Sequence, residues 1–522
     1  MATTIAKAKE YKVQDGDTMQ SIADANGVTI AELAKFNFGS DKPDDINKGM
    51  RSKVGSIKKA ADKKNLIFSS VDDPGILYIP ENFPEPSFAS NGSHSITVKQ
   101  IPVKTFIPSK VMVEFRPKTD WKGEFGFDWL RVGDVGEKSY KSIINGGWKG
   151  LVDDGTGKMI DENYPTAADA YTALKTKYFK LPTEVKNKKY YVPYLNLYPP
   201  SAKGTPAPPT SAELRLFITV EDEEPLKIEF EYHKGIFQLD KQEMSDKAIG
   251  AKREASDKTV KITCLEEFDT DQEIKVLAYP KTWKFNDPVP IAGKIIVCAN
   301  NRSVRKNMKF VLVKVKTKLG VAEKLGTFGG TEKTNLYNTL YQAYIYGQTK
   351  NYVNPDDASK SYLDLTADAN FKIIGATRGQ FVDATSALIN HYFPAGGDTA
   401  LFGYLWDAFR KQPGGDKFDD HFPVFSFGDS GSNNVIGKIQ SIGGVFQKKL
   451  VLFGNRDNTT LNHEVLHGLK MRHTHRESSA TFLPKPEAKF TYVHSETDNV
   501  MSYVAVALTT WHWQWKIMRK NV

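Results

Sequence analysis

Two histidines one helical turn apart stand in the stretch HEVLHGLKMRH, residues 463–473. His463 and His467 are four positions apart, so on an α-helix their side chains project from one face. This spacing lets two imidazole nitrogens reach one tetrahedral metal ion at about 2.0 to 2.1 Å each. Glu464 lies beside the first histidine, where its carboxylate can contact a metal-bound water without ligating the metal. The stretch therefore predicts a metal site that can activate water.

Residues further along the chain extend this pattern. His473 follows His467 by six positions, and this is the spacing of the third ligand in the longer motif H-E-x-x-H-x-x-G-x-x-H. Downstream, Met501 and Tyr503 stand in the stretch NVMSY, which matches a Met-turn with a tyrosine two places after the methionine. Together these features resemble the site of the metzincin zinc metallopeptidases.

The resemblance implies a Zn²⁺ site with three imidazole ligands: His463, His467 and His473. It also implies roles for three other residues. Glu464 would take a proton from the zinc-bound water and give it to the leaving amine. Tyr503 would donate a hydrogen bond to the oxyanion or act as a displaceable metal ligand. Met501 would pack beneath the metal and would not react.

One position departs from the family motif. Lys470 stands where the family has a glycine, and that glycine lets the chain turn back to the third histidine. A lysine with positive φ costs on the order of 1 kcal/mol, so a different backbone path is an alternative. His475 would then be a substitute ligand, and Glu487 or Glu496 would serve if the site were of the Glu type. We favour His473 because the Met-turn fits only the three-histidine class.

A group of histidines can also arise without a metal. Five of the ten histidines fall within 32 residues: His463, His467, His473, His475 and His494. In this alternative the chain is a structural or adaptor protein with an inactive site.

The motif is expected on a helix of an α+β domain. Residues 445–455, VFQKKLVLFGN, predict a strand just before it, and this strand could pair with an extended substrate near Lys448 to Phe453. Helical spacing of apolar residues predicts further helices in three stretches: TEKTNLYNTLYQAYIYG, GQFVDATSALINHYF and ALFGYLWDAFRKQ. We assign residues 325–522 to a metzincin-like zinc metallopeptidase domain.

A different pattern occupies residues 8–82. It predicts a strand, a helix capped by Asp17 or Thr18, a second helix from about Thr29, and a returning strand in GILYIP. The stretch resembles a LysM module at these positions: Tyr11, Val13, Gly16, Asp17, Thr18, Ile22, Ala23, Val28, Leu33, Asn37, Leu77, Ile79 and Pro80. The resemblance implies a small βααβ domain that binds peptidoglycan, or one that serves as an assembly adaptor. It departs from the family in a long insert between Asn37 and Leu77.

The middle of the chain is rich in β-branched and aromatic residues. A polar linker with prolines, at 81–95, precedes this region. A second, proline-rich linker at 198–213 divides it. The strands and turn signals suggest one or two β-sandwiches. We favour two spacer domains, at 96–198 and 211–318.

Two aromatic stretches could be glycan-binding surfaces or core. In WKGEFGFDWLRVGD, the favoured interpretation is packing in a sandwich core by Trp121, Phe125, Phe127 and Trp129. Near the C-terminus, Trp511 and Trp515 share a helical face, and a closing helix packed on the core is favoured over sugar stacking.

Composition limits the remaining classes. The 71 basic and 62 acidic residues give a net charge of +9, but the lysines are scattered, so we expect no nucleic-acid partner. No stretch approaches the roughly 18 to 20 apolar residues of a membrane span. Cys264 and Cys298 lie in β-rich sequence and could pair or remain thiols. The first residues lack the apolar region of a secretory signal peptide, so we expect export from the cytoplasm by a non-Sec route.

These patterns predict a zinc-dependent endopeptidase that hydrolyses peptide bonds in proteins. We expect a bacterial toxin or effector delivered by a contractile injection or type VI secretion apparatus, with a protein or peptide substrate and apparatus components as partners. The first alternative is a peptidoglycan peptide hydrolase targeted by its LysM module. The second is the adaptor with an inactive site.

Overall fold

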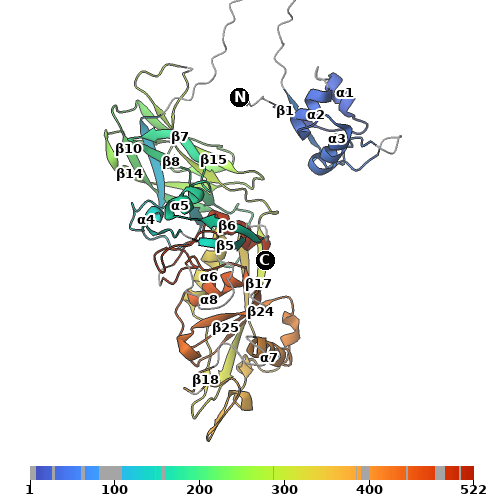
Figure 1. Ribbon diagram of the computed structural model, residues 1–522, viewed down its shortest axis with the longest axis vertical. Helices are drawn as coiled ribbons and strands as arrows, with labels where there is room; N and C mark the ends of the chain where they lie inside the picture. The colour runs from blue at the N-terminus through green and yellow to red at the C-terminus, as the bar shows by residue number, and fades with distance from the viewer. Residues whose placement is uncertain are drawn as a thin grey trace, which may run out of the picture. The chain divides into compact units, whose positions relative to one another are not determined.

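The computed structural model describes residues 8–25, 30–59, 65–80, 109–146, 148–153, 159–285, 287–383, 385–388, 399–442, 445–475, 488–504 and 507–522. The chain divides into two compact units, Met1–Ile101 and Pro102–Val522 (Figure 1). Each unit has its own core.

The N-terminal unit is built on two antiparallel strands with two helices between them: β1 (Ala8–Lys12), α1 (Met19–Ala25), α2 (Ile30–Phe38) and β2 (Ile76–Pro80). Thr18 caps α1, because its Oγ1 accepts a hydrogen bond from the Ser21 amide at 2.9 Å. The Asn37 side chain joins α2 to β2, donating to the Tyr78 carbonyl at 2.7 Å and accepting from the Tyr78 amide at 2.8 Å. The predicted βααβ order is confirmed.

The insert between α2 and β2 is part of this unit's core. It contains α3 (Pro43–Gly49) and a π-helical turn, η1 (Met50–Val54). Its apolar side chains are buried against those of α1 and α2: Met50, Val54, Leu66 and Phe68. The insert therefore contributes to the stability of the unit.

A β-sandwich begins the second unit. One sheet has the order β12-β14-β10-β3, and the other has the order β13-β11-β15-β16-β9-β4. The strands are β3 (Val111–Pro117), β4 (Gly126–Asp128), β9 (Tyr194–Asn196), β10 (Ser211–Val220), β11 (Lys227–Glu231), β12 (Phe237–Leu239), β13 (Glu243–Met244), β14 (Gly250–Cys264), β15 (Gln272–Tyr279) and β16 (Ile291–Val297). Phe125, Phe127 and Trp129 are buried in the shared core and Trp121 packs against it, which confirms their predicted structural role.

The two predicted spacers at 96–198 and 211–318 are a single sandwich in the structure. β3 pairs with β10 across the predicted linker, and β9 pairs with β16. Residues 96–108 lie outside the described part of the chain. Alternation in a sequence shows which face of a strand is apolar, but it carries no information on which strand lies beside it.

The helix that contains His463 and His467 packs against a second mixed sheet. Its main strands are β17 (Lys306–Thr317), β19 (Ile345–Asn351), β23 (Phe422–Ser426), β25 (Val445–Leu452) and β24 (Gly437–Ile442). β17 is parallel to β19 and β23, β23 is parallel to β25, and β24 is antiparallel to β25 at the edge. The predicted end of the second spacer thus belongs to the C-terminal domain, which begins with β17.

Helices cover both faces of this sheet (Figure 1). α6 (Gly330–Gln342) and α8 (Thr460–Gly468) share a core with one face, and α7 (Thr399–Arg410) shares a core with the other. Shorter elements complete the domain: β18 (Lys324–Leu325), η2 (Ala358–Lys360), β20 (Leu363–Asp364), η3 (Ala369–Phe371), β21 (Ile373–Ile374), β22 (Thr377–Arg378), η4 (Gly415–Phe418) and η5 (Ser432–Asn434).

One predicted helix is wrong in its described part. In GQFVDATSALINHYF, residues 379–383 and 385–388 form turns and isolated bridges, and the remainder lies outside the described residues. Phe381 and Leu388 are buried in the α7-side core without being helical, because apolar spacing over a short stretch does not distinguish a helix from a packed loop.

Between β4 and β9 the chain leaves the sandwich. This excursion contains α4 (Tyr140–Ile143), β5 (Trp148–Asp153), β6 (Met159–Tyr164), α5 (Ala167–Lys175), β7 (Lys180–Val185) and β8 (Lys188–Tyr191). Its aromatic and aliphatic side chains share a core with Phe490, Tyr492 and Trp511 near the C-terminus. The sandwich and the C-terminal domain are therefore packed together by a common core.

The last helix, α9 (His512–Lys520), closes the C-terminal domain. Trp511 and Trp515 are buried, so the predicted packing of this helix is confirmed. Among the described residues, no helix has the length and apolar character needed to cross a bilayer. Cys264 and Cys298 are free thiols, and burial raises the pKa of Cys264 to about 11.

Candidate metal centre

The helix α8 places His463, Glu464 and His467 where the sequence predicts them. Its start is fixed by Asp457, whose Oδ1 accepts hydrogen bonds from the amides of Thr459 and Thr460 at 2.8 and 2.9 Å. A carboxylate at this end of a helix also interacts favourably with the helix dipole. The apolar face of α8 packs against the sheet core, and this holds the histidine face in place.

Lys470 ends α8 with the backbone conformation that favours glycine, at a φ of 67°. The Lys470 amide donates to the His467 carbonyl at 2.8 Å, and the Met471 amide donates to the Leu466 carbonyl at 3.0 Å. These two bonds form a Schellman ending, in which the chain reverses direction at the helix terminus. A lysine therefore makes the turn that leads back to His473.

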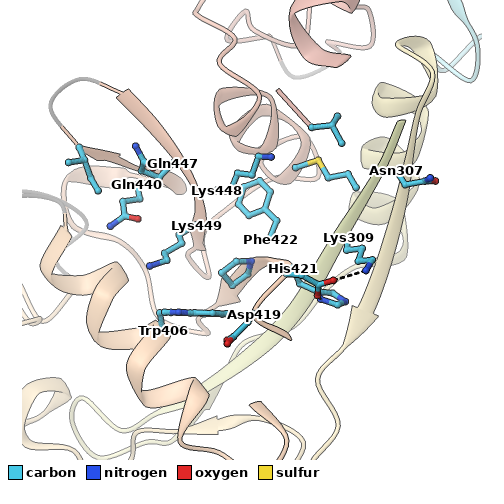
Figure 2. Close-up of a pocket in the computed structure, with 15 residues that line it drawn as sticks. Asn307, Lys309, Trp406, Asp419, His421, Phe422, Gln440, Gln447, Lys448 and Lys449 are labelled. Atoms are coloured by element: carbon cyan, nitrogen blue, oxygen red, sulfur yellow. Dashed lines mark hydrogen bonds and ion pairs between the residues drawn. The ribbon is translucent and has the colours of Figure 1, made fainter. Parts of the chain in front are cut away.

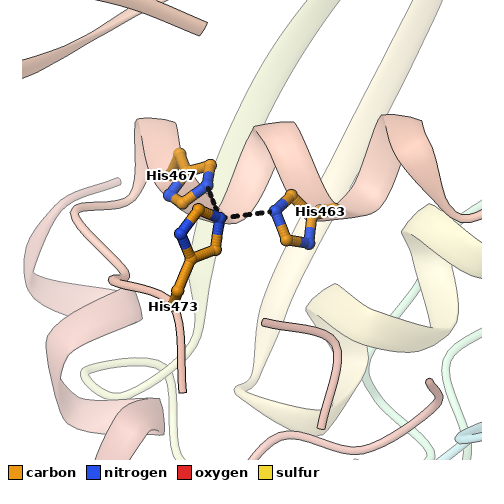
Figure 3. Close-up of side chains that lie close together, drawn as sticks. All are labelled: His463, His467 and His473. Carbon is orange, nitrogen blue, oxygen red and sulfur yellow. Dashed lines mark hydrogen bonds between the residues drawn. The ribbon is translucent and has the colours of Figure 1, made fainter. Parts of the chain in front are cut away.

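Three imidazoles meet beside α8 (Figure 3). The Nε2 atom of His473 lies 3.1 Å from Nε2 of His463 and 3.0 Å from Nε2 of His467. Ligands at about 2.0 to 2.1 Å from a tetrahedral ion are separated by roughly 3.3 Å. The three side chains could thus hold one metal ion.

The other ring nitrogens fix the tautomers of the two helical histidines. Nδ1 of His463 donates to the Val500 carbonyl at 2.9 Å, and Nδ1 of His467 donates to the Met471 carbonyl at 2.9 Å. Their Nε2 atoms therefore carry lone pairs that face His473. Burial lowers the pKa of His463 to about 3 and holds the pKa of His467 well below its usual value, with His473 adding to both shifts. Neutral imidazoles are the form that binds metal.

The predicted Met-turn contacts this group through the Val500 carbonyl, which is hydrogen-bonded to His463. The Asn499 side chain accepts a hydrogen bond from the Met501 amide at 3.0 Å, and the Ser502 amide donates to the Asn499 carbonyl at 2.9 Å. Met501 is fully buried in the core shared with α8. The turn presents the Val500 carbonyl to His463, so its backbone orients a candidate ligand.

Glu464 and Tyr503 are the two candidate catalytic residues of the sequence analysis. Burial raises the pKa of Glu464 to about 7, which suits a group that takes and returns a proton near neutral pH. Glu464 stands against β24, where a Cβ on Gly437 would lie 3.1 Å from its Cγ. The Tyr503 hydroxyl is 3.0 Å from Nε2 of His473, and the side chain is 52% exposed.

The alternative ligands do not join the group in the described part of the chain. The His475 ring stacks on that of His473, with 5.0 Å between centroids. Glu496 forms an ion pair with Lys138 at 2.7 Å. Glu487 lies outside the described residues.

The strand predicted to pair with substrate has both of its edges occupied. Leu450 of β25 is paired with Val424 of β23 and with Ile439 of β24. On the β25 side of the sheet, the edge among the described strands is formed by β24, which lies beside Glu464. The sequence placed β25 next to the motif in the chain, but the edge position depends on the tertiary order of the strands.

A pocket of about 630 Å³ opens near the N-terminal ends of β17, β23 and β25 (Figure 2). Trp406, Phe422 and Lys449 are among its lining residues. On its wall Asp420 is held by Lys309 at 2.6 Å and by Nδ1 of His421 at 2.6 Å. None of the three imidazoles of the candidate metal site lines this pocket.

Comparison with known proteins identifies one part of the chain. The family model of the LysM domain matches residues 11–51. Residues 11–51 are a LysM domain. This supports the binding of peptidoglycan by the N-terminal unit. No curated protein matches the chain.

Several residues that shape the candidate site have no signal in the motif. The carbonyls of Val500 and Met471 orient the imidazoles, and a backbone carbonyl leaves no trace in a sequence. The Gln514 side chain accepts a hydrogen bond from Asn499 Nδ2 at 2.9 Å, and both side chains are fully buried. A polar residue on the apolar face of a predicted C-terminal helix is the only sequence feature that could have indicated Gln514.

Proposed function

We propose that the protein is a zinc-dependent endopeptidase that cuts peptide bonds in proteins. The observation that carries this proposal is the convergence of three imidazoles, in which Nε2 of His463 and Nε2 of His467 lie 3.1 and 3.0 Å from Nε2 of His473. The same helix carries Glu464, whose pKa burial raises to about 7. Three neutral imidazoles form a donor set that suits zinc. The remaining metal position would be open to water and substrate.

Each nearby residue has a role in this proposal. When bound, zinc supplies a Lewis acid that polarises the scissile carbonyl. Glu464 takes a proton from the attacking water and passes it to the leaving amine. Tyr503 donates a hydrogen bond from its hydroxyl to the carbonyl oxygen as negative charge develops there.

The edge strand β24 gives the substrate a place to bind. An extended peptide can add to an exposed strand edge through backbone hydrogen bonds. β24 lies beside Glu464 and ends the sheet among the described strands. A substrate strand paired there passes next to the imidazoles.

A second candidate is hydrolysis of peptide crosslinks in the cell wall. It is supported by the LysM domain at residues 11–51, because this domain would bring the metal site to peptidoglycan. The two candidates share the same chemistry and differ in the substrate.

The test compares two substrates and two carboxylate variants. The zinc-loaded chain is incubated with an unfolded generic protein and, separately, with purified sacculi. Glu464→Ala should retain zinc and lose turnover by about 10²- to 10⁴-fold, the usual contribution of a general acid–base. Glu496→Ala is the matched control, since Glu496 is a nearby carboxylate outside the imidazole group.

Cleavage of the unfolded protein that Glu464→Ala abolishes would support the endopeptidase. Release of wall peptides with the protein left intact would move the assignment to the second candidate. No cleavage of either substrate would refute a catalytic role for Glu464. An equal loss of turnover in Glu464→Ala and Glu496→Ala would refute it as well.

A further inference from the structure

A buried arginine of the sandwich region reaches the Met-turn. Arg131 is fully buried, and its guanidinium lies 3.6 Å from the centre of the Trp129 ring. Nη1 donates to Asp128 Oδ1 at 2.7 Å, and Nη2 donates to Asp498 Oδ2 at 3.1 Å. Asp498 immediately precedes Asn499 of the Met-turn, so this one guanidinium joins the sandwich to the turn.

Asp128 makes a second connection to the same region. Its Oδ2 accepts hydrogen bonds from the His512 amide at 3.1 Å and from His512 Nδ1 at 2.7 Å. The Tyr178 hydroxyl donates to the same carboxylate at 3.1 Å. Asp128 therefore fixes the start of α9, the helix that carries Gln514.

Both connections continue through the backbone to His463. The Asp498 carbonyl accepts hydrogen bonds from the amides of Leu508 and Thr509, each at 3.0 Å, and the Val500 amide donates to the Thr509 carbonyl at 2.8 Å. The Val500 carbonyl in turn accepts from Nδ1 of His463 at 2.9 Å. The second route runs from α9 through the Gln514 side chain to Asn499.

We infer that Arg131 and Asp128 are positioning residues of the metal centre, so that the sandwich and the C-terminal domain build the site together. Arg131 fixes Asp498, and Asp498 fixes the backbone that presents the Val500 carbonyl to His463. Outer groups that orient a histidine ligand set its tautomer and ring direction, and their loss usually costs about 10- to 100-fold in metal affinity. The inference rests on the proposed zinc site for its effect on metal binding, but the order of the Met-turn can be measured without metal.

The chain offers a matched control for Arg131. Arg116 is also a buried arginine that contacts two carboxylates, with Asp134 at 2.6 Å and Glu114 at 3.0 Å. Glu114 lies on β3 and Asp134 lies in the loop after β4. Among the described residues, the ion pairs of Arg116 do not involve the Met-turn. Arg131→Lys and Arg116→Lys therefore make the same chemical change, and only the first one removes a link to Asp498.

The experiment measures both variants in the full chain. Hydrogen exchange of the metal-free protein reports on the amides of Val500, Met501 and Ser502, which are hydrogen-bonded in the turn. Affinity for Zn²⁺ is measured by competition with a chelator, and the Co²⁺ absorption spectrum reports the geometry of the site. We expect Arg131→Lys to speed exchange at these amides and to weaken Zn²⁺ binding by about tenfold or more, and Arg116→Lys to do neither.

Unchanged exchange of these amides in Arg131→Lys would overturn the inference, as would an equal change in Arg116→Lys. If the parent chain binds no Zn²⁺, the proposed function fails, and the exchange measurement by itself decides whether Arg131 positions the turn. A loss of thermal stability common to both variants does not affect this comparison, because the effect of Arg131→Lys is measured relative to that of Arg116→Lys.

Discussion

At the scale of the residue, Lys470 is the position of the candidate site that differs from the motif H-E-x-x-H-x-x-G-x-x-H, which has glycine there. Its φ of 67° places an L-residue with a Cβ in the left-handed region, which costs about 1 kcal/mol relative to glycine. The Schellman bonds at the end of α8 and the burial of Met471 hold this conformation. The surrounding packing thus enforces a turn that the residue itself does not favour.

Lys470→Gly should therefore be more stable than Lys470→Ala by about 1 kcal/mol and leave metal affinity unchanged. The Lys470 ammonium also contacts the Phe446 carbonyl, and this contact is lost in both Lys470→Gly and Lys470→Ala. The difference in the free energy of unfolding between these two variants, taken from urea denaturation, isolates the backbone term. A glycine variant that is no more stable than the alanine variant would contradict the assigned strain.

At the scale of the element, a cluster of four charges joins β3, β14 and the loop that follows β4. Arg116 and Lys252 lie between the carboxylates of Glu114 and Asp134, and all four side chains are at most 18% exposed. Although burial opposes it, the two cations hold the pKa of Glu114 and of Asp134 below their usual values. The cluster is stable only while both acids are ionised.

This cluster predicts a loss of stability in acid. Because the folded-state pKa values are lowered, the ionised carboxylates stabilise the fold above their unfolded pKa of about 4, and this contribution is lost as the pH falls below that value. Asp134→Asn should lower the free energy of unfolding by about 2 kcal/mol at pH 7 and flatten its decline between about pH 5 and pH 2. Urea denaturation of both proteins across this range checks the prediction, and parallel pH profiles would contradict it.

At the scale of the whole molecule, the chain separates into a LysM-containing unit and a larger unit that holds the candidate site. The cores of the two units are distinct. The proposed binding to the cell wall and the proposed metal chemistry are therefore expected to be separable by cutting between the units. The sandwich, in contrast, shares a core with the C-terminal domain and is not separable in this way.

Removal of residues 1–101 should abolish sedimentation with purified sacculi, while Zn²⁺ affinity and the turnover of an unfolded protein stay within about twofold of the full chain. The residues that remain, Pro102–Val522, form a compact unit. Sacculus binding that persists at high salt in the shortened chain would contradict a targeting role for the LysM domain. Loss of Zn²⁺ binding would contradict the independence of the two units.

The sequence by itself determined the local features of this protein. The period of apolar residues and the candidate caps Asp17 and Thr18 predicted the LysM elements, and the spacing of His463 and His467 predicted that both lie on one face of a helix. Such features depend on residues within a few positions of each other, so a single sequence contains them. The third imidazole at His473 was also predicted, from the family motif.

Only the tertiary structure decided how distant segments combine. β3 pairs with β10, β24 rather than β25 is the edge strand, and Arg131 reaches Asp498 across more than three hundred residues. These contacts are chosen by the burial of apolar faces and the pairing of buried charges over the whole fold, and many pairings satisfy the same alternation in sequence. The positive φ of Lys470 has the same origin, because the packing around α8 outweighs the local preference of the residue.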